Sequence, residues 1–396
     1  MSTAAPLSAR RTGLALGVIC AAFFAAGFAL AAFGPVLPAL SARTGGSLYG
    51  VGWIMNLNFA GSLVAQFIVG WGGHRFGRRL AIALGLALFG GCAAVVAGSH
   101  ALWLSLAIAI PMGIGYGGST LSGNVLSSEI VPSRRAFAVN LVNAFYGVGA
   151  IAGPLAVSVL LTRTGEAVAA LWIGALLLGV CALGSTLLLP DLGPAKIQQG
   201  SPAPRSVSIT DPLLITCGVF TLIYVGSEIG VGTWASLYLQ RTAGLDAAQS
   251  AAATSVFWAA LTLGRLAATV AGMRLDAEHL LTASVWLACS GAALLWAGHG
   301  SAAVSIAAYA VIGVGFGPIY PTAVAVVTSA FPHAGGEATS RMGILAAIGG
   351  MTLPLLHSLV ITHRPPRDHA LLTLAMAVAM IVVWGRVRRL AHAHPA

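Results

Sequence analysis

The sequence predicts an all-α membrane protein whose twelve transmembrane helices form two pseudo-symmetric six-helix bundles. Composition and the spacing of apolar runs lead to this prediction. Hydrophobic residues make up 58% of the chain and charged residues only 8%, and the mean hydropathy is +0.90. A soluble domain needs roughly a quarter of its residues charged to cover its surface. Most of this protein's surface must therefore face lipid, which excludes a soluble multidomain protein.

The apolar runs give the number of helices. A helix that crosses a bilayer needs about 20 mainly apolar residues. Arg10 and Arg11 precede the first run, but that run continues for about 25 residues and further runs follow, so it is predicted as a membrane helix rather than a signal peptide. Splitting the chain at charged, Pro-rich and Gly-rich breaks gives runs at 13–38, 48–71, 80–98, 101–126, 137–162, 167–190, 212–239, 250–272, 280–297, 302–329, 341–362 and 370–385.

The basic residues give the orientation. With both termini in the cytoplasm, fourteen Lys and Arg residues lie on the cytoplasmic side and five on the opposite side. This distribution satisfies the positive-inside rule, and an odd number of spans would destroy it. We therefore expect a multi-pass protein of a bacterial inner (cytoplasmic) membrane with cytoplasmic termini. The basic residues form short scattered clusters rather than one phosphate-binding face, so no nucleic acid partner is expected.

The chain divides into two similar halves. Its longest polar connection, 191–211, is rich in Pro, Gly and Ser and is predicted as a cytoplasmic linker between an N-terminal bundle, 1–190, and a C-terminal bundle, 212–396. Matching residues recur at an offset of 200 between the halves, which indicates an internal repeat. The matches are Gly113 with Gly313, Gly115 with Gly315, Gly117 with Gly317, Pro132 with Pro332, Gly149 with Gly349 and Pro154 with Pro354.

The loop between the second and third runs reads "GWGGHRFGRR" (70–79). Together with the twelve runs and the repeat, it resembles the major facilitator superfamily of secondary transporters over essentially the whole chain. The resemblance implies a conformational latch, in which loop arginines pair with helix C-termini and with carboxylates of the other half in one conformation. His74 stands where the family has Asp, which removes a fixed negative charge, and simple anchoring by the arginines is the alternative. The latch residues would be Gly70, His74, Arg75, Gly77, Arg78 and Arg79.

Three segments carry a narrower resemblance. They are "YVGSEIGVGTW" (224–234), "FWAALTLGRL" (257–266) and "GFGPIYPT" (315–322), and they resemble the fucose/glucose:proton symporter branch of the superfamily. The acids that such proteins use in the first and fourth spans have no counterpart here, where Thr120 and Asn124 stand in the fourth span. This branch also includes members with substrates other than sugars.

Glu228 is the one acid of ten that falls deep in a predicted span, and Arg265 is the one base. An ionised side chain at the bilayer centre costs at least ~2.5–3.5 kcal/mol, so such residues usually face a cavity or a partner. Glu228 is expected either to carry a proton or contact substrate, or to brace neighbouring helices. Measured from the cytoplasmic helix ends, Glu228 is ~24 Å deep and Arg265 ~10 Å deep. We therefore expect no direct pair, with Arg265 a structural charge that reaches toward cytoplasmic water.

Uncharged polar and aromatic side chains recur at helical spacing in several spans. Amides, phenols and rings that line a cavity suit a neutral ligand rich in hydroxyls; the alternative is that they brace helices against one another. The substrate-binding candidates are Tyr116, Thr120 and Asn124 in the fourth span, Asn140, Asn143 and Tyr146 in the fifth, Asn56, Asn58, Tyr224, Trp234, Trp258, Tyr320 and His357.

These observations predict a secondary active transporter that moves a sugar or sugar-like solute by alternating access, with protons as the coupling ion. Because no catalytic arrangement or phosphate loop occurs, and no Cys-x-x-Cys pair, we expect no enzyme, cofactor or metal site. We expect a monomer whose partners are solute, protons and lipid. The alternative is proton-driven efflux of amphipathic compounds, since "GVGAIAGPLAVS" (147–158) partly resembles the drug-antiporter pattern through Gly149, Gly153 and Pro154.

Overall fold

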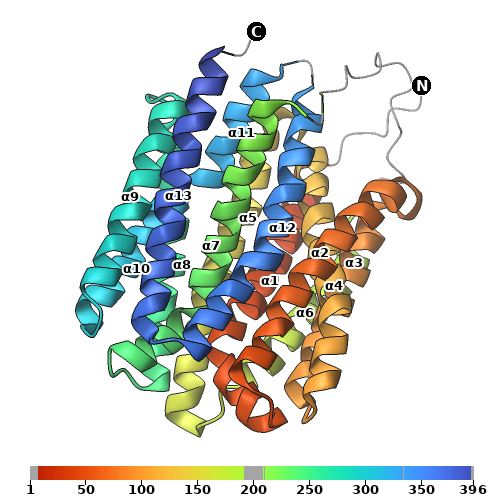
Figure 1. Ribbon diagram of the computed structural model, residues 1–396. Helices are drawn as coiled ribbons and strands as arrows, with labels where there is room; N and C mark the ends of the chain where they lie inside the picture. The colour runs from red at the N-terminus through yellow and green to blue at the C-terminus, as the bar shows by residue number, and fades with distance from the viewer. Residues whose placement is uncertain (1–7, 191–207, 209, 333, 394–396) are drawn as a thin grey trace.

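A computed structural model describes residues 8–190, 208, 210–332 and 334–393 (Figure 1). Twelve helical spans in this part of the chain are long and apolar enough to cross a membrane, which confirms the predicted all-α architecture. The helices are α1 (Ala9–Thr44), α2 (Leu48–Phe76), α3 (Arg78–Gly98), α4 (Leu102–Ile130), η1 (Pro132–Arg134), α5 (Arg135–Thr164), α6 (Ala169–Leu188), α7 (Pro212–Thr242), α8 (Ala247–Ala271), α9 (Ala277–Ala297), α10 (Ala302–Phe316), α11 (Ile319–Ala330), α12 (Gly335–His363) and α13 (Pro366–Ala393).

The tenth span is interrupted, although the sequence predicts one continuous helix over 302–329. Helix α10 ends at Phe316 and α11 begins at Ile319, with Gly317 and Pro318 between them. Proline has no backbone N–H and its ring clashes with the preceding turn, so it breaks a helix. The last span is longer than predicted, because the helix continues through Arg386, Arg388 and Arg389 after the apolar run ends.

The repeated glycines occupy equivalent packing positions. A Cβ on Gly115 of α4 would lie 2.5 Å from the Phe89 nitrogen of α3, and one on Gly315 of α10 would lie 2.5 Å from the Ala288 nitrogen of α9. Likewise, a Cβ on Gly149 of α5 would overlap the Phe24 carbonyl of α1, and one on Gly349 of α12 the Leu222 carbonyl of α7. Each contact in the first half recurs six spans later. The glycines therefore set the close helix approach on which the pseudo-symmetric fold depends.

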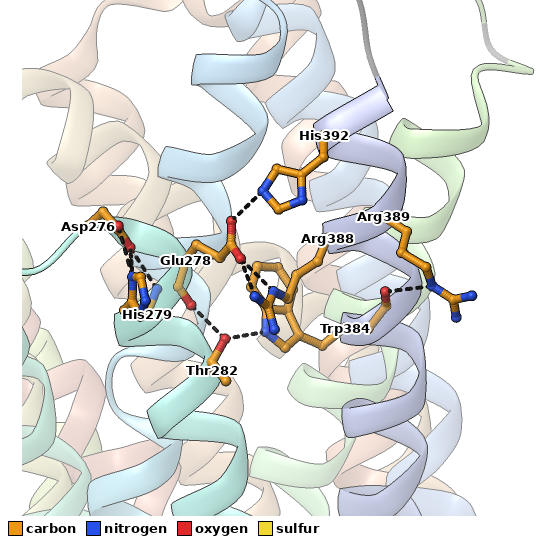
Figure 2. Close-up of polar contacts among 9 residues, drawn as sticks. Asp276, Glu278, His279, Thr282, Trp384, Arg388, Arg389 and His392 are labelled. Carbon is orange, nitrogen blue, oxygen red and sulfur yellow. Dashed lines mark hydrogen bonds and ion pairs between the residues drawn. The ribbon is translucent and has the colours of Figure 1, made fainter.

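Helix α13 is fixed to α9 by polar contacts near the C-terminal end of α13 (Figure 2). The Arg388 guanidinium donates from Nε to Glu278 Oε1 over 2.6 Å, and His392 Nε2 lies 3.1 Å from Glu278 Oε2. Trp384 Nε1 donates to Thr282 Oγ1 over 2.8 Å. The neighbouring Arg389 instead donates to the Gly385 carbonyl of its own helix.

The predicted latch loop begins as the end of α2 and turns at Gly77, which has φ of 70° and connects to α3. The side chains of Gly70–Phe76, including His74 and Arg75, lie outside the described residues. Arg78 Nη2 lies 3.2 Å from Glu129 Oε1 of α4, and Arg79 donates to the Thr186 carbonyl at the end of α6. Arg79 thus does meet a helix C-terminus. Both arginines bond within the first six spans, however, so neither of these two makes the expected pairing with a carboxylate of the other half in the described part of the chain.

The predicted linker 191–211 lies outside the described residues except for Ser208, Thr210 and Asp211. Asp211 caps α7 by accepting from the Leu213 and Leu214 nitrogens.

Helices α1, α2 and α5 contact α7, α12 and α8, respectively. Several of these contacts lie toward the end of the bundle where α1 ends and α2 begins, which we term the distal end. There the rings of Tyr49 and His363 lie 5.5 Å apart, and a Cβ on Gly52 would lie 2.7 Å from Ser358 Oγ and 2.8 Å from Trp234 Cζ2. We term the residues Tyr49, Gly52, Trp234, Ser358 and His363 the distal seal.

Candidate functional site

A central cavity of about 290 Å³ lies where α1, α2, α4 and α5 meet α7 and α8. This volume is at the lower end of the range for small-molecule sites, about 300–1,000 Å³. Its lining is formed by Phe23, Leu30, Ala31, Gly34, Met55, Phe59, Tyr116, Thr120, Asn124, Asn143, Tyr146, Val225, Glu228, Ile229, Gly232, Thr233, Trp258 and Arg265.

Glu228 and Arg265 form an ion pair on one wall of this cavity. Arg265 Nη2 lies 3.2 Å from Glu228 Oε1, and the two side chains are 33% and 14% exposed, respectively. The prediction that depth keeps them apart is therefore wrong. The predicted depths were measured from the start of α7 and the end of α8. These two ends are not joined by a short loop, so their relative height is not fixed by the sequence.

The short loop 243–246 between α7 and α8 gives the better reference, because it holds two helix ends side by side. Glu228 lies 14 residues before the end of α7 and Arg265 lies 18 residues after the start of α8. At 1.5 Å per residue these depths are about 21 and 27 Å, and the long arginine side chain spans the difference.

The opposite wall of the cavity carries uncharged hydrogen-bonding groups from α4 and α5. The Tyr116 and Tyr146 hydroxyls lie 3.2 Å apart, and Thr120 Oγ1 donates to the Tyr116 carbonyl. Asn143 Nδ2 donates to Asn124 Oδ1 over 2.8 Å and to the Val139 carbonyl. Within the described residues, Asn124 Nδ2 and Asn143 Oδ1 bond no protein group. One amide donor and one amide acceptor therefore remain for a ligand.

The remaining lining is mostly apolar and aromatic. Trp258 lines the cavity from α8, and its indole Nε1 has no hydrogen-bond partner in the described part of the protein. Phe59 from α2 packs edge-on against Tyr116, with ring centroids 6.4 Å apart. Such rings offer a stacking surface next to the polar walls.

The cavity gathers seven of the predicted site residues, namely Glu228, Tyr116, Thr120, Asn124, Asn143, Tyr146 and Trp258, together with Arg265. The other seven candidates are not part of its lining. Asn56, Asn58, Tyr224, Trp234 and His357 are buried between helices, Tyr320 is half-buried, and Asn140 is exposed.

Sequence reasoning missed much of the lining. Phe23, Leu30 and Gly34 of α1, Met55 and Phe59 of α2 and Thr233 of α7 all face the cavity. The apolar members give no signal because an apolar residue fits a lipid-facing or core position equally well in this chain. Thr233 follows Glu228 by five residues, which is about 140° around the helix, so the helical period does not place it on the Glu228 face and gives no signal for it.

Twelve helices in the described part of the chain that are long and apolar enough to cross a membrane, arranged around a central cavity, fit the class of membrane transporters. The chain belongs to the Major Facilitator Superfamily, whose family model matches residues 19–354. No curated protein sequence matches the chain.

Solved structures confirm the fold. The nucleoside transporter NupG, as a D323A mutant, superposes with a TM-score of 0.79 at 13% identity, over 94% of this chain and 99% of that one. A bacterial homologue of the human lysosomal transporter Spinster, in an inward-facing occupied conformation, superposes with a TM-score of 0.78 at 14% identity, over 97% of this chain and 98% of that one. Its inward-facing unoccupied form superposes with a TM-score of 0.75 at 14% identity, over 98% of this chain and 99% of that one. At these identities the likeness establishes the fold and not the substrate, and the narrower resemblance to the fucose/glucose:proton symporter branch is not confirmed.

Proposed function

We propose that this protein imports a small neutral solute rich in hydroxyl groups, such as a sugar or a sugar-bearing compound, together with protons. The observation that carries the proposal is the division of the cavity into an uncharged wall from α4 and α5 and an ion-paired wall from α7 and α8. The first wall suits the solute and the second suits the proton.

The uncharged wall favours a hydroxylated ligand. Asn124 Nδ2, Asn143 Oδ1 and the paired tyrosine hydroxyls together offer donors and acceptors without net charge. Hydroxyl groups donate and accept at once, so they satisfy such a wall better than an ion does. Trp258 and Phe59 offer ring faces for the apolar side of a sugar or for an attached planar group. The solute's size is limited by the cavity volume of about 290 Å³.

Glu228 is the proposed proton carrier. Its carboxylate faces the cavity and its charge is balanced by Arg265. Taking up a proton removes the negative charge and releases the guanidinium, which changes the charge pattern of the wall beside the bound solute. If the outward-open and inward-open conformations bind this proton with different affinities, protonation of Glu228 shifts the population toward the conformation that binds the proton more tightly.

Alternating access of the bundles 1–190 and 212–396 is the proposed mechanism. The contacts of the distal seal hold the two sets of helices together at one end, and two of the similar structures are inward-facing. The positive-inside pattern makes the distal end the outer side of a bacterial inner membrane, with both termini cytoplasmic. We further propose that the protein acts as a monomer and has no enzymatic activity. The proposed latch is the pairing of the loop arginines with helix C-termini and with carboxylates of the other half in one conformation, and for Arg78 and Arg79 this requires release from Glu129 and α6.

A binding screen tests the substrate class. Purified protein in detergent is heated with neutral sugars, nucleosides, organic acids, amino acids and lipophilic cations, and the unfolding temperature is recorded. The proposal expects stabilisation by one or more hydroxylated neutral solutes, lost in Asn143→Leu and kept in the matched control Asn140→Leu, whose side chain is exposed outside the cavity. Stabilisation by lipophilic cations alone would instead support the efflux alternative.

A further inference from the structure

His357 of α12 and His369 of α13 form a pair outside the central cavity, and both side chains are 0% exposed. His357 Nδ1 lies 3.0 Å from His369 Nε2, and the ring centroids are 4.9 Å apart at an interplanar angle of 66°. The other two nitrogens, His357 Nε2 and His369 Nδ1, have no hydrogen-bond partner in the described residues. The transport account given so far uses neither side chain.

The neutral pair cannot satisfy all its nitrogens. If His369 Nε2 donates to His357 Nδ1, then His357 carries its proton on Nε2 and His369 Nδ1 is a bare acceptor. The opposite tautomers leave a bare acceptor at His357 and an unused N–H at His369. Either way, one buried N–H and one buried lone pair remain unpaired, and each such group costs about 1–3 kcal/mol. Two unpaired nitrogens on side chains that are 0% exposed are unfavourable for stability, so their presence needs a functional explanation.

The pair lies next to the distal seal. A Cβ on Gly230 of α7 would lie 2.8 Å from His357 Nε2, so the imidazole packs directly on the α7 backbone. Ser358, the next residue, faces Gly52 of α2 across the seal, and its hydroxyl is also unpaired. On the other side of the pair, the Tyr238 ring packs on His369 with centroids 5.6 Å apart. A change at the pair is thus transmitted directly to the helices that close the distal end.

We propose that the His357–His369 pair is a second proton-binding site, separate from Glu228, whose protonation opens the distal seal. The proposal rests on the alternating-access part of the proposed function. A proton from water at the distal end binds the bare nitrogen of the pair, and the resulting imidazolium shares its N–H with the other ring. Both outward nitrogens then carry N–H groups and the pair carries one positive charge.

The closed seal cannot accommodate that charge. Burying an unpaired ion without water or a counter-ion is strongly unfavourable. A conformation in which water enters between α7, α12 and α2 solvates both N–H groups. The open state therefore binds the proton more tightly than the closed state, and acid at the distal side shifts the population toward opening. This arrangement would make the site ready to load solute when the proton concentration outside is high.

Within the described residues, the neighbouring ionisable groups do not supply the pair with a counter-ion within bonding distance. On α7, Glu228 is paired with Arg265, and the Arg241 guanidinium donates to the Ile361 carbonyl one turn from His357. Tyr238 donates to the Leu295 carbonyl over 3.4 Å. On α13, Asp368 precedes His369 in the first turn. Tyr49 of α2 contacts His363 rather than the pair, and the Tyr320 hydroxyl of α11 lies beside Gly343 of α12.

Distance measurements across the seal test this proposal. Cysteines replace Tyr49 and His363 in a variant without the five native cysteines. They carry spin labels, and the distance distribution is recorded between about pH 7.5 and pH 5.5, which brackets the ordinary histidine pKa of about 6.5. Replacing His363 also removes the one histidine of the distal seal, so that only the His357–His369 pair remains as a histidine site there. We expect the population with separated labels to rise at least threefold on acidification.

Substitutions at the pair and at Glu228 separate the two proton sites. His357→Gln and His369→Gln keep a hydrogen-bonding amide that does not titrate, and each alone should abolish the rise, so either variant suffices if the other fails to fold. Glu228→Gln should keep the rise while losing proton-driven transport. An unchanged rise in both glutamine variants, or no rise in the labelled parent, overturns the proposal for the histidine pair. Loss of the rise in Glu228→Gln alone assigns the effect to Glu228 and also overturns it.

Discussion

Arg265 Nη2 and Glu228 Oε1 lie 3.2 Å apart, which joins α8 to α7 at the wall of the central cavity. The pair balances the charge of the carboxylate that the sequence singles out. It also explains why a chain with few charged residues retains an arginine in this span: a cavity-facing carboxylate and its counter-ion stabilise one another.

The ion pair predicts non-additive stability changes. Arg265→Gln leaves the Glu228 carboxylate without a cation. Breaking a fully buried pair costs about 3–5 kcal/mol, and because these side chains are partly exposed we expect a smaller loss of about 1–2 kcal/mol. The double variant Glu228→Gln/Arg265→Gln removes both charges and should be more stable than Arg265→Gln alone. Thermal unfolding in detergent measures the cycle, and losses that simply add would contradict direct pairing.

The asparagine pair predicts a loss of solute affinity. Asn143→Leu removes the amide acceptor that faces the cavity and the bond to Asn124 Oδ1. Because a lost hydrogen bond with one partner left unpaired costs about 1–3 kcal/mol, Kd should rise by roughly fivefold to a hundredfold. Titration of the solute found by the screen measures this change. Asn140→Leu, one turn earlier on the same helix, is the control, and an equal loss there would show that the effect is structural.

The repeated glycines predict matched destabilisation in the two halves. In Gly149→Ala the new methyl group overlaps the Phe24 carbonyl, and in Gly349→Ala it overlaps the Leu222 carbonyl. Each change should lower stability by about 1–3 kcal/mol, which is typical of overpacking. Gly179→Ala on α6 meets nothing within 4 Å and should leave the unfolding temperature nearly unchanged. If only one of the two repeated glycines is sensitive, their contacts are not equivalent.

The contacts between α9 and α13 predict local rather than global effects. Arg388→Ala removes a partly exposed ion pair with Glu278, so its cost should be only about 0.2–1 kcal/mol. Thr282→Val removes the acceptor of Trp384 Nε1 and should cost about 1 kcal/mol. Hydrogen exchange of the last two turns of α13 should become faster in both variants. Arg389→Ala is the control, because in the described part of the chain that side chain bonds only its own helix, and an equal acceleration there would rule out the cross-helix contacts as the cause.

The fold was predictable from the sequence because insertion into a membrane constrains both the composition of the chain and the order of its apolar and charged segments. Long apolar runs, alternating basic clusters and repeated glycines each reflect one physical constraint, namely hydrocarbon thickness, orientation or close helix packing. The sequence contains Gly317 and Pro318, but the apolar run over 302–329 predicts one continuous helix, because hydropathy alone does not show where a helix breaks.

The site was predictable only in part, because polarity identifies candidates without fixing the side of the helix they face. Asn143 and Asn140 lie on the same helix, yet one lines the cavity and the other is exposed. His357 looked like a cavity residue, whereas its partner His369 was missed because it lies near the start of the last span. Glu228 and Arg265 meet because the short loop after α7 holds the end of α7 beside the start of α8. Depths measured from the other two ends, the start of α7 and the end of α8, do not take this loop into account.

The central claim is that Glu228 carries the coupling proton, and transport by purified protein in liposomes tests it most directly. With an inward proton gradient, the wild type should accumulate the identified solute above its external concentration. Glu228→Gln should still exchange solute across the membrane in counterflow, because the cavity and its asparagine wall remain, but it should not accumulate solute. Accumulation by Glu228→Gln to the wild-type level under the same gradient would contradict the account.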